Sequence, residues 1–263
     1  MNLLVTDIDC TLSVGETVSA EVVSACRMLC DNGWQIMIAT GRTLQSCLSH
    51  KRQISALDTA IVYDGARIMS AGSGKEILGF ELSHDEVLEI LELSWDSELE
   101  IQVTGDENIY CRWSDAETRD FCQKTGLSYE IIDSPNIEGK VYRIAFWGEQ
   151  KKIRSFELIL KNKFYKKFSI TRGGDNFLDV LPCGVSKGYA LKELIRREYI
   201  RLPEIIVAAG DHMNDYELLE YADISVVPHD CAPEILKLAD VIMPSVEGNG
   251  FSFLAKILID CNL

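Results

Sequence analysis

The sequence predicts an α/β fold in which one parallel β-sheet is built from both ends of the chain, with a separate α+β segment inserted between them. Three observations predict this fold. Strands and helices alternate near the N-terminus, the same alternation returns after about residue 186, and the segment between shows paired short strands instead. The 263 residues are enough for one large domain or two modest ones, each with a buried core.

The N-terminal part has the pattern of strand, loop, capped helix and strand. Residues 3–6 form a short apolar run that predicts a buried strand, and Ser19 is placed to cap a helix. Apolar residues follow this cap at helical spacing: Val22, Val23, Cys26, Leu29 and Cys30. Gly33 ends the helix, and residues 34–39 and 60–63 predict a second and a third buried strand.

The C-terminal part repeats this rhythm. A helix is expected from about Ser186, a strand over residues 205–209 and a helix from Asp215, with further strands near 224–227 and 241–243. Because strands alternate with helices at both ends of the chain, we expect the two ends to share one parallel sheet.

The middle of the chain has a different pattern. Residues 101–104 and 109–113 flank the turn Gly105-Asp106-Glu107-Asn108, as in a β-hairpin. The elements expected next are helices over 115–125 and 150–162 and strands over 129–132, 141–146, 168–171 and 177–181. We therefore expect an inserted α+β domain over 81–182 and a core over 1–80 and 183–263. An insertion at this point lies near the carboxyl ends of the strands, where parallel sheets bind ligands, and it could act as a lid.

Composition narrows the class of protein. The chain has 26 Lys and Arg against 41 Asp and Glu, a net charge of −15, and no cationic stripe, which argues against nucleic acid as a partner. Its apolar runs are far shorter than the about 20 residues of a membrane-spanning helix, so no membrane partner is expected. No leader pattern opens the chain, so a cytoplasmic location is expected. The nine scattered cysteines form no disulfide or zinc pattern.

Polar residues follow the first two predicted strands. Asp7 and Asp9 come directly after the first, and in extended backbone their side chains share a face, so that one could attack while the other moves protons. An acidic loop cap is the alternative reading of this pair. Thr40, Gly41 and Arg42 follow the second strand with a hydroxyl, an open amide and a guanidinium, which together suit a phosphate.

Two later segments add charge near the same edge. Lys187 lies near a predicted helix start, and Asp211, Asn214 and Asp215 follow the strand at 205–209. Oxygen ligands from Asp7 and Asp211 suit Mg²⁺, which prefers a few carboxylates together with waters and substrate phosphate.

These four motifs, in this order, resemble those of the haloacid dehalogenase superfamily of phosphotransferases. The place of the insertion, and the run Leu178-Asp179-Val180-Leu181-Pro182 before Val185-Ser186-Lys187-Gly188, resemble the Cof-type sugar phosphatases with a C2-type cap. The resemblance covers nearly the whole chain. It implies a Rossmann-like parallel-sheet core with an inserted α+β cap domain that selects the substrate, and Mg²⁺-dependent phosphatase activity.

The resemblance also implies a role for each motif residue. Asp7 would be the nucleophile that forms an aspartyl-phosphate, and Asp9 would protonate the leaving oxygen and then activate water. Asp7, the backbone carbonyl of Asp9 and Asp211 would hold the metal, with Asp215 close around it, and Thr40 and Lys187 would hold the phosphate. The expected phosphate-binding set is Ile8, Thr40, Gly41, Arg42, Lys187 and Asn214. For Arg42, a surface or indirect role is the alternative to direct contact.

Three positions depart from the family pattern. Cys10 stands where glycine is usual, which would strain the backbone by about 1 kcal/mol if the position needs a positive φ. Asp64 stands where relatives often carry asparagine, and it adds negative charge to a site for anions. His212 stands where a small residue is usual, either as a partly exposed loop histidine or as a substrate contact.

Several tempting features have simpler readings. Residues 72–75 end like a P-loop, but Glu76 replaces the required Ser or Thr, so we expect a hairpin turn. Cys26 and Cys30 are expected in the core rather than on a metal. Four residues of the insertion could face a substrate but are expected to be solvated: Lys140, Arg143, Arg172 and Asn176.

The sequence thus predicts a Mg²⁺-dependent phosphatase that hydrolyses a small phosphorylated metabolite, with a sugar phosphate expected. Two alternatives stay open. One is a phosphomutase or other phosphotransferase, because an aspartyl-phosphate can be passed to an acceptor other than water. The other is a non-catalytic phosphometabolite-binding module, which Cys10 and Asp64 motivate. The sequence leaves the oligomeric state open.

Overall fold

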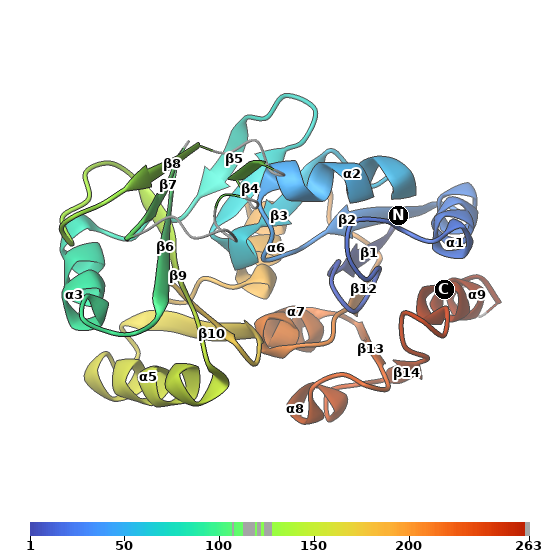
Figure 1. Ribbon diagram of the computed structural model, residues 1–263. Helices are drawn as coiled ribbons and strands as arrows, with labels where there is room; N and C mark the ends of the chain where they lie inside the picture. Colours follow the sequence, from blue (N-terminus) through green and yellow to red (C-terminus); the bar gives the residue numbers. More distant parts are fainter. Residues whose placement is uncertain (107, 113–118, 120–121, 124–127, 261–263) are drawn as a thin grey trace. The chain divides into compact units, whose positions relative to one another are not determined.

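The computed structural model describes residues 1–106, 108–112, 119, 122–123 and 128–260 (Figure 1). The chain divides into two compact units. The first is made of Met1–Leu78 with Ser186–Leu263, and the second of Gly79–Val185.

The first unit contains a five-stranded parallel sheet with the strand order β14-β13-β12-β1-β2. Its strands are β1 (Asn2–Thr6), β2 (Trp34–Ile38), β12 (Ile205–Ala209), β13 (Ile224–Pro228) and β14 (Val241–Met243). Thr6 at the end of β1 pairs with Ala209 on one side and Ile38 on the other. The polar residues that follow these three strands therefore start from the same edge of the sheet, and the predicted α/β fold is confirmed.

Two helices of the first unit, α1 (Ala20–Asp31) and α6 (Lys187–Arg196), begin at the caps expected from the sequence, Ser19 and Ser186. The unit contains further helices, α2 (Leu44–Ile54), α7 (Tyr216–Tyr221), α8 (Pro233–Leu236) and α9 (Gly250–Asp260), with a 3₁₀ turn at Met213–Asp215. The side chain of Ser19 accepts from the amide of Val22 at 3.2 Å, and that of Ser186 accepts from the amide of Tyr189 at 3.1 Å. Gly33 follows α1 with φ +85°, as its role in ending the helix requires.

The third predicted strand is placed differently from the expectation. β3 (Thr59–Val62) pairs antiparallel with β4 (Arg67–Ser70), which neighbours β5 (Glu76–Gly79) in a separate three-stranded sheet. A single parallel bridge between Ala39 and Ile61 links β3 to the chain after β2. The turn at Tyr63–Gly65 reverses the chain, so its next strand pairs with β3. Residues 72–75 join β4 to β5 and confirm the predicted hairpin turn.

The second unit contains a six-stranded sheet with the order β10-β11-β9-β6-β7-β8. Its strands are β6 (Glu100–Gly105), β7 (Asn108–Cys111), β8 (Ser128–Ile131), β9 (Val141–Trp147), β10 (Phe168–Gly174) and β11 (Phe177–Pro182). β6 and β7 pair antiparallel, which confirms the predicted hairpin. The helix predicted over 115–125 lies outside the described residues, apart from Arg119, Cys122 and Gln123.

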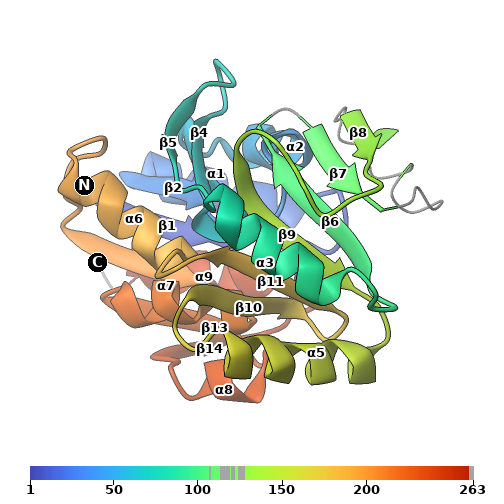
Figure 2. The same ribbon diagram turned by 90° about the vertical axis from the view of Figure 1, so that its left-hand side faces the viewer.

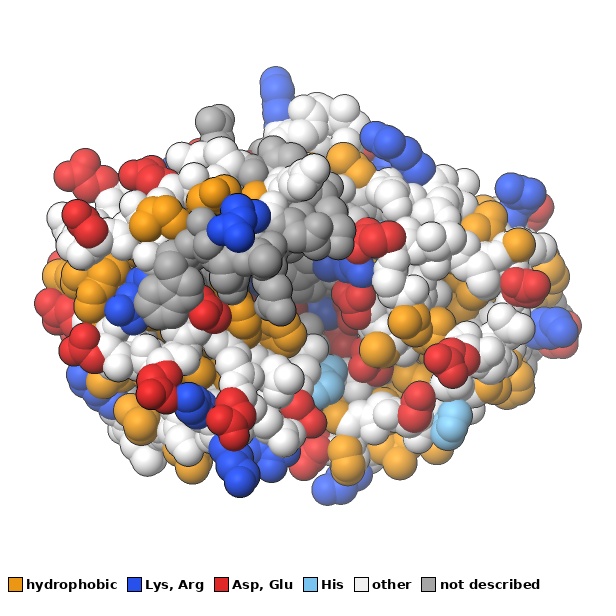
Figure 3. Space-filling view, viewed as in Figure 1, with side chains coloured by type: hydrophobic (Ala, Val, Ile, Leu, Met, Phe, Trp, Pro, Cys, Tyr) orange, Lys and Arg blue, Asp and Glu red, His pale blue; other side chains and the backbone are white. Residues whose placement is uncertain are grey.

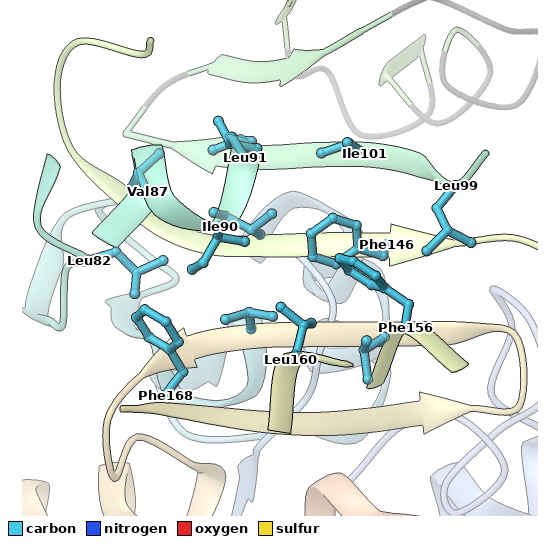
Figure 4. Close-up of a cluster of buried hydrophobic side chains, with 14 of the residues drawn as sticks. Leu82, Val87, Ile90, Leu91, Leu99, Ile101, Phe146, Phe156, Leu160 and Phe168 are labelled. Atoms are coloured by element: carbon cyan, nitrogen blue, oxygen red, sulfur yellow. The ribbon is translucent and has the colours of Figure 1, made fainter. Parts of the chain in front are cut away.

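Two helices pack on one face of this sheet, α3 (His84–Ser94) and α5 (Gln150–Lys163) (Figure 2). Their apolar side chains and those of the strands form one buried cluster (Figure 4). Phe146 of β9 and Phe156 of α5 meet edge to face, with ring centroids 4.9 Å apart. The second unit thus has a hydrophobic core of its own.

The surface is mixed in character. On the face shown in Figure 3, acidic and basic side chains are interspersed, with hydrophobic ones between them. Across the described residues, no helix combines the length and apolar character that crossing a membrane requires. The cysteines of the described part of the chain are free thiols; Cys26 is fully buried in the core as expected, whereas Cys30 is only partly buried.

Candidate active site

Three carboxylates gather at the carboxyl edge of the parallel sheet. Asp7 follows β1, and its amide donates to the carbonyl of Ala209 at 2.9 Å. Asp211 and Asp215 follow β12, and one carboxylate oxygen from each of the three residues lies within 4.8 Å of the others. Asp7 is buried, Asp215 is fully buried and Asp211 is partly buried. The structure therefore concentrates negative charge where solvent screens it weakly.

Lys187 lies among these carboxylates as the first residue of α6. Its Nζ is 2.9 Å from Oδ1 of Asp7 and donates to Oδ1 of Asp215 at 2.7 Å, and the side chain is fully buried. Gly188 explains how α6 comes so close, because a Cβ there would lie 2.3 Å from the carbonyl oxygen of Glu217. The glycine lets α6 approach the start of α7 and so brings the ammonium to the aspartates.

Asp215 shapes the loop that carries Asp211. Its Oδ2 accepts from the amides of Asp211 at 3.0 Å and His212 at 3.2 Å. Gly210 is required at the start of this loop, because a Cβ there would lie 2.5 Å from the Cβ of Asp215. Asp211 in turn accepts from the hydroxyl of Thr11 at 3.2 Å. The loop is thus built to hold a carboxylate beside Asp7.

Burial and mutual repulsion shift the pKa values of this group. Burial raises the pKa of Asp7 well above its ordinary value; Lys187 opposes this effect, and Asp215 and Asp211 add to it. Burial, followed by the charge of Asp215, raises the pKa of Asp211 to about 7. Burial alone would lower the pKa of Lys187, but the charges of Asp215 and Asp7 hold it above its ordinary value. One ammonium faces three carboxylates, so the group favours a further cation.

Asp9 lies outside this group of three carboxylates and contacts Arg42. The guanidinium donates from Nε to Oδ2 of Asp9 at 2.9 Å and from Nη2 to Oδ1 at 2.7 Å. It also donates to Oε1 of Glu16 at 2.9 Å and to the carbonyl of Gly15 at 3.1 Å. The side chain of Asp9 is half exposed. In this structure Arg42 therefore orients the Asp9 carboxylate through a bidentate salt bridge.

Thr40 and Gly41 lie beside the carboxylates on the segment after β2. Thr40 is fully buried, its amide donates to the carbonyl of Ile61 at 2.9 Å, and its Oγ1 accepts from the amide of Arg42 at 3.2 Å. A Cβ on Gly41 would lie 3.0 Å from a carboxylate oxygen of Asp64. A side chain at position 41 would therefore crowd the Asp64 carboxylate, which would have to shift by a few tenths of an ångström.

The loop after Asp7 is a tight turn. The carbonyl of Ile8 accepts from the amides of Leu12 and Ser13, each at 2.9 Å. Cys10 has φ +55° within this turn, so the left-handed backbone anticipated for it is present, and its side chain is exposed. Burial of part of the thiol, followed by the charge of Asp211, raises the pKa of Cys10.

Asp64 and Asn214 complete the cluster. Asp64 is buried, its Oδ1 accepts from Nδ2 of Asn214 at 2.8 Å, and the same oxygen is 4.0 Å from Nζ of Lys187. His212 is partly buried in the loop that carries Asp211.

Sequence reasoning missed some of these contacts. It gave no role to Glu16 or Thr11, and no local pattern marks either as a partner of a distant side chain. The turn Tyr63–Gly65 could have been suspected from Gly65 alone, which has φ +99°. Of the cations expected to be solvated, Lys140 is exposed and pairs with Glu81, as expected. Arg143 is buried and pairs with Asp179, so the expectation is wrong there, and Arg172 is partly buried and pairs with Glu157.

Comparison with known proteins identifies the family. The haloacid dehalogenase-like hydrolases match residues 4–254, so the chain belongs to that family. This confirms the family that the sequence motifs predicted, and it confirms that the protein is a hydrolase. Two curated relatives are named HMP-PP phosphatase: that of Cronobacter sakazakii is 26% identical over 88% of this chain and 85% of its own length, and that of Serratia proteamaculans is 23% identical over the same shares.

Solved structures share the fold. A haloacid dehalogenase-like hydrolase from B. subtilis has a TM-score of 0.82 at 21% identity, covering 97% of this chain and 99% of its own. A sugar phosphatase of haloacid dehalogenase subclass IIB has the same TM-score and identity, covering 98% and 99%. The predicted architecture, a parallel-sheet α/β fold with additional sheets, is confirmed at the level of the fold.

Proposed function

We propose that this hydrolase is a Mg²⁺-dependent phosphatase that cleaves a small phosphorylated metabolite through an aspartyl-phosphate on Asp7. The observation that carries the proposal is the contact of the Asp7 carboxylate with the Lys187 ammonium, beside Asp211 and Asp215. A nucleophile, a buried cation and two further carboxylates then meet at one sheet edge. The names of the curated relatives support a phosphate ester as substrate.

The donor set fits a hard divalent cation. Asp7, Asp211 and Asp215 offer carboxylate oxygens within 4.8 Å of one another, and Mg²⁺ prefers oxygen ligands. We assign Asp7, the backbone carbonyl of Asp9 and Asp211 as its ligands, with Asp215 close by. When bound, Mg²⁺ would offset the negative charge that repels a phosphate from this acidic group.

Residues of the chain carry out the chemical steps and hold the phosphate. Asp7 attacks phosphorus, the bond from phosphorus to the ester oxygen breaks, and Asp9 gives its proton to the leaving oxygen. Water then attacks phosphorus of the aspartyl-phosphate while Asp9 takes its proton, which releases phosphate and restores Asp7. Lys187, Thr40 and the amides of the loop at Ile8 and Gly41 would hold the phosphate oxygens.

The substrate class completes the proposal. We expect a sugar phosphate, selected by the second unit, Gly79–Val185, acting as a cap domain, and we expect the enzyme to act in the cytoplasm on a free metabolite rather than on nucleic acid. The contacts of Arg42 with Asp9 and Glu16 support an orienting role for Arg42 over direct phosphate binding.

The test is hydrolysis of an aryl phosphate and of a sugar phosphate panel by the full chain with Mg²⁺, with EDTA, and by Asp7→Asn. We expect turnover that requires the metal and is lost in the variant. Transfer of the phosphoryl group to a sugar rather than to water would show a mutase. Binding of Mg²⁺ and phosphate without turnover on the whole panel would replace the phosphatase by a binding module.

A further inference from the structure

Asp64 is a buried carboxylate to which the reaction just described gives no role. It lies in the turn Tyr63–Gly65 after β3, where three successive residues have positive φ: 50° at Tyr63, 52° at Asp64 and 99° at Gly65. Non-glycine residues in this region are strained, and they persist only where their surroundings hold them. The neighbours of this turn must therefore hold it in its strained conformation.

The turn is held from two sides. The amide of Tyr63 donates to the carbonyl of Arg42, and that of Asp64 donates to the carbonyl of Thr40, both at 3.1 Å. On the other side, a Cβ on Gly65 would lie 2.2 Å from the carbonyl oxygen of Ser186, the cap of α6. The turn therefore joins the phosphate-binding segment after β2 to the helix that carries Lys187.

The carboxylate of Asp64 contacts two residues of the proposed site. Its Oδ1 accepts from Nδ2 of Asn214 at 2.8 Å and lies 4.0 Å from Nζ of Lys187. Because a carboxylate can only accept, this contact fixes which end of the Asn214 amide faces Asp64. Oδ1 of Asn214 is then turned away, and it is buried without a hydrogen-bond partner among the described residues. A buried acceptor left open in this way suits a donor that arrives with a ligand.

Asp64 also changes the charge balance. Lys187 already contacts Asp7 and Asp215, so Asp64 adds one more negative charge within 4.0 Å of the same ammonium. In a buried site this charge weakens the attraction of Lys187 for an anion and strengthens the attraction of the group for a cation.

We propose that Asp64 is a positioning and specificity-determining residue: it orients the Asn214 amide, and it shifts the site's preference toward the divalent cation at the expense of phosphate affinity. The inference rests on the proposed function, whose Mg²⁺ and phosphate share this site.

The test is calorimetric binding of Mg²⁺ alone, and of inorganic phosphate in the presence of Mg²⁺, to the full chain and to Asp64→Asn. Asparagine has the same size and tolerates the left-handed backbone, so the variant removes charge without adding strain. We expect phosphate to bind about tenfold more tightly and Mg²⁺ to bind several-fold more weakly. The control is Asp58→Asn. Asp58 accepts from the Ser70 hydroxyl and the Gly72 amide rather than pairing with Lys187, so loss of its charge should change neither binding constant.

A second pair of variants tests the orientation. Asn214→Asp places a carboxylate against Asp64 and should lower the melting temperature, and adding Asp64→Asn restores one donor and one acceptor in reversed order. Recovery of the melting temperature in the double variant is expected. If Asp64→Asn leaves both binding constants within twofold of wild type, or shifts them in the same direction, the inference is wrong. Failure of the proposed function is separate, because it would appear as absent turnover in the wild-type chain.

Discussion

At the scale of single residues, Cys10 departs from the family pattern at a position whose backbone conformation favours glycine. Its φ of +55° belongs to the left-handed region, where a Cβ is strained and glycine is not. The tight turn around the Ile8 carbonyl imposes this conformation, since the amides of Leu12 and Ser13 both donate to that oxygen. The turn therefore carries a strain that substitution can relieve.

We predict that Cys10→Gly raises the free energy of unfolding by up to about 1 kcal/mol, because it removes the strained Cβ while the unfolded chain gains some freedom. Urea denaturation measures this change. Cys10→Ala is the matched control: it keeps the Cβ and should stay close to wild type. An equal gain in both variants would show that the thiol, not the backbone, is responsible.

We predict that Lys187→Met lowers the free energy of unfolding by about 3–5 kcal/mol at pH 7, because it leaves Asp7 and Asp215 buried without their cation. The loss should shrink as the pH falls, since burial already raises the pKa of Asp7 and removing the Lys187 ammonium, which lowers it, raises it further. Lys192→Met, on the exposed side of the same helix, is the control for losing a lysine from α6. Equal losses at both positions would contradict the account.

Much of the site at this scale could be predicted from the sequence. Asp7, Lys187, Asp211 and Asp215 come together because each follows a strand or begins a helix at one edge of the sheet, and order along the chain reveals this. The partner of Arg42 could not be predicted, because a long side chain chooses among several carboxylates by geometry that no spacing encodes.

At the scale of elements, caps decide where helices begin. α3 has a complete capping box: the side chain of Ser83 accepts from the amide of Glu86 at 3.4 Å, and the side chain of Glu86 accepts from the amide of Ser83 at 2.8 Å. Ser83 and Glu86 are spaced as such a box requires, and this signal could have located α3 from sequence alone.

We predict that Ser83→Ala lowers the free energy of unfolding of the second unit by about 1 kcal/mol, because the first amides of α3 lose their acceptor. Chemical denaturation followed by a signal from that unit measures it. Ser24→Ala, an exposed substitution inside α1, should be neutral or slightly stabilising, since alanine favours helix interiors. A neutral Ser83→Ala would mean that the box contributes nothing.

Asp240, in the loop before β14, makes the stability of the fold depend on pH. The amide and the hydroxyl of Ser225 donate to Asp240, each at 2.8 Å, and these bonds, the amide first, lower the pKa of Asp240. A carboxyl whose pKa is lower in the folded state contributes stability above its unfolded value of about 3.9, and this stability is lost as the pH falls through the folded value.

We therefore predict that wild type loses more stability than Asp240→Asn as the pH falls below about 4. Urea denaturation at a series of pH values gives the comparison. Parallel curves for the two proteins would show that the Ser225 contacts do not favour the ionised form.

The neighbour of a strand is harder to predict than the strand itself. An apolar run such as that of β3 reveals burial but not its partner, and here the turn at Tyr63–Gly65 sends the chain back along β3 in place of a crossover into the parallel sheet. The sequence pattern of a strand therefore does not reveal its partner strand, because the pairing of β3 depends on a turn whose residues have positive φ.

At the scale of the whole molecule, the chain consists of two units with separate cores. The alternation of strands and helices at both ends, interrupted by hairpin patterns, was enough to predict an α/β sheet with an α+β insertion. What the insertion binds could not be predicted, because its charged side chains pair with one another in ways that depend on the sheet's register.

We propose that Asp7 carries the phosphoryl group during turnover. The most direct measurement is an acid quench of Asp9→Asn reacting with an aryl phosphate and Mg²⁺, followed by peptide mass analysis. An aryl oxide leaves readily without an acid, while release from the enzyme needs the base, so the account predicts a phosphoryl group trapped on Asp7. The same experiment with Asp7→Asn should show none. Turnover by Asp9→Asn without any label on Asp7, or a label on another residue, would contradict the account.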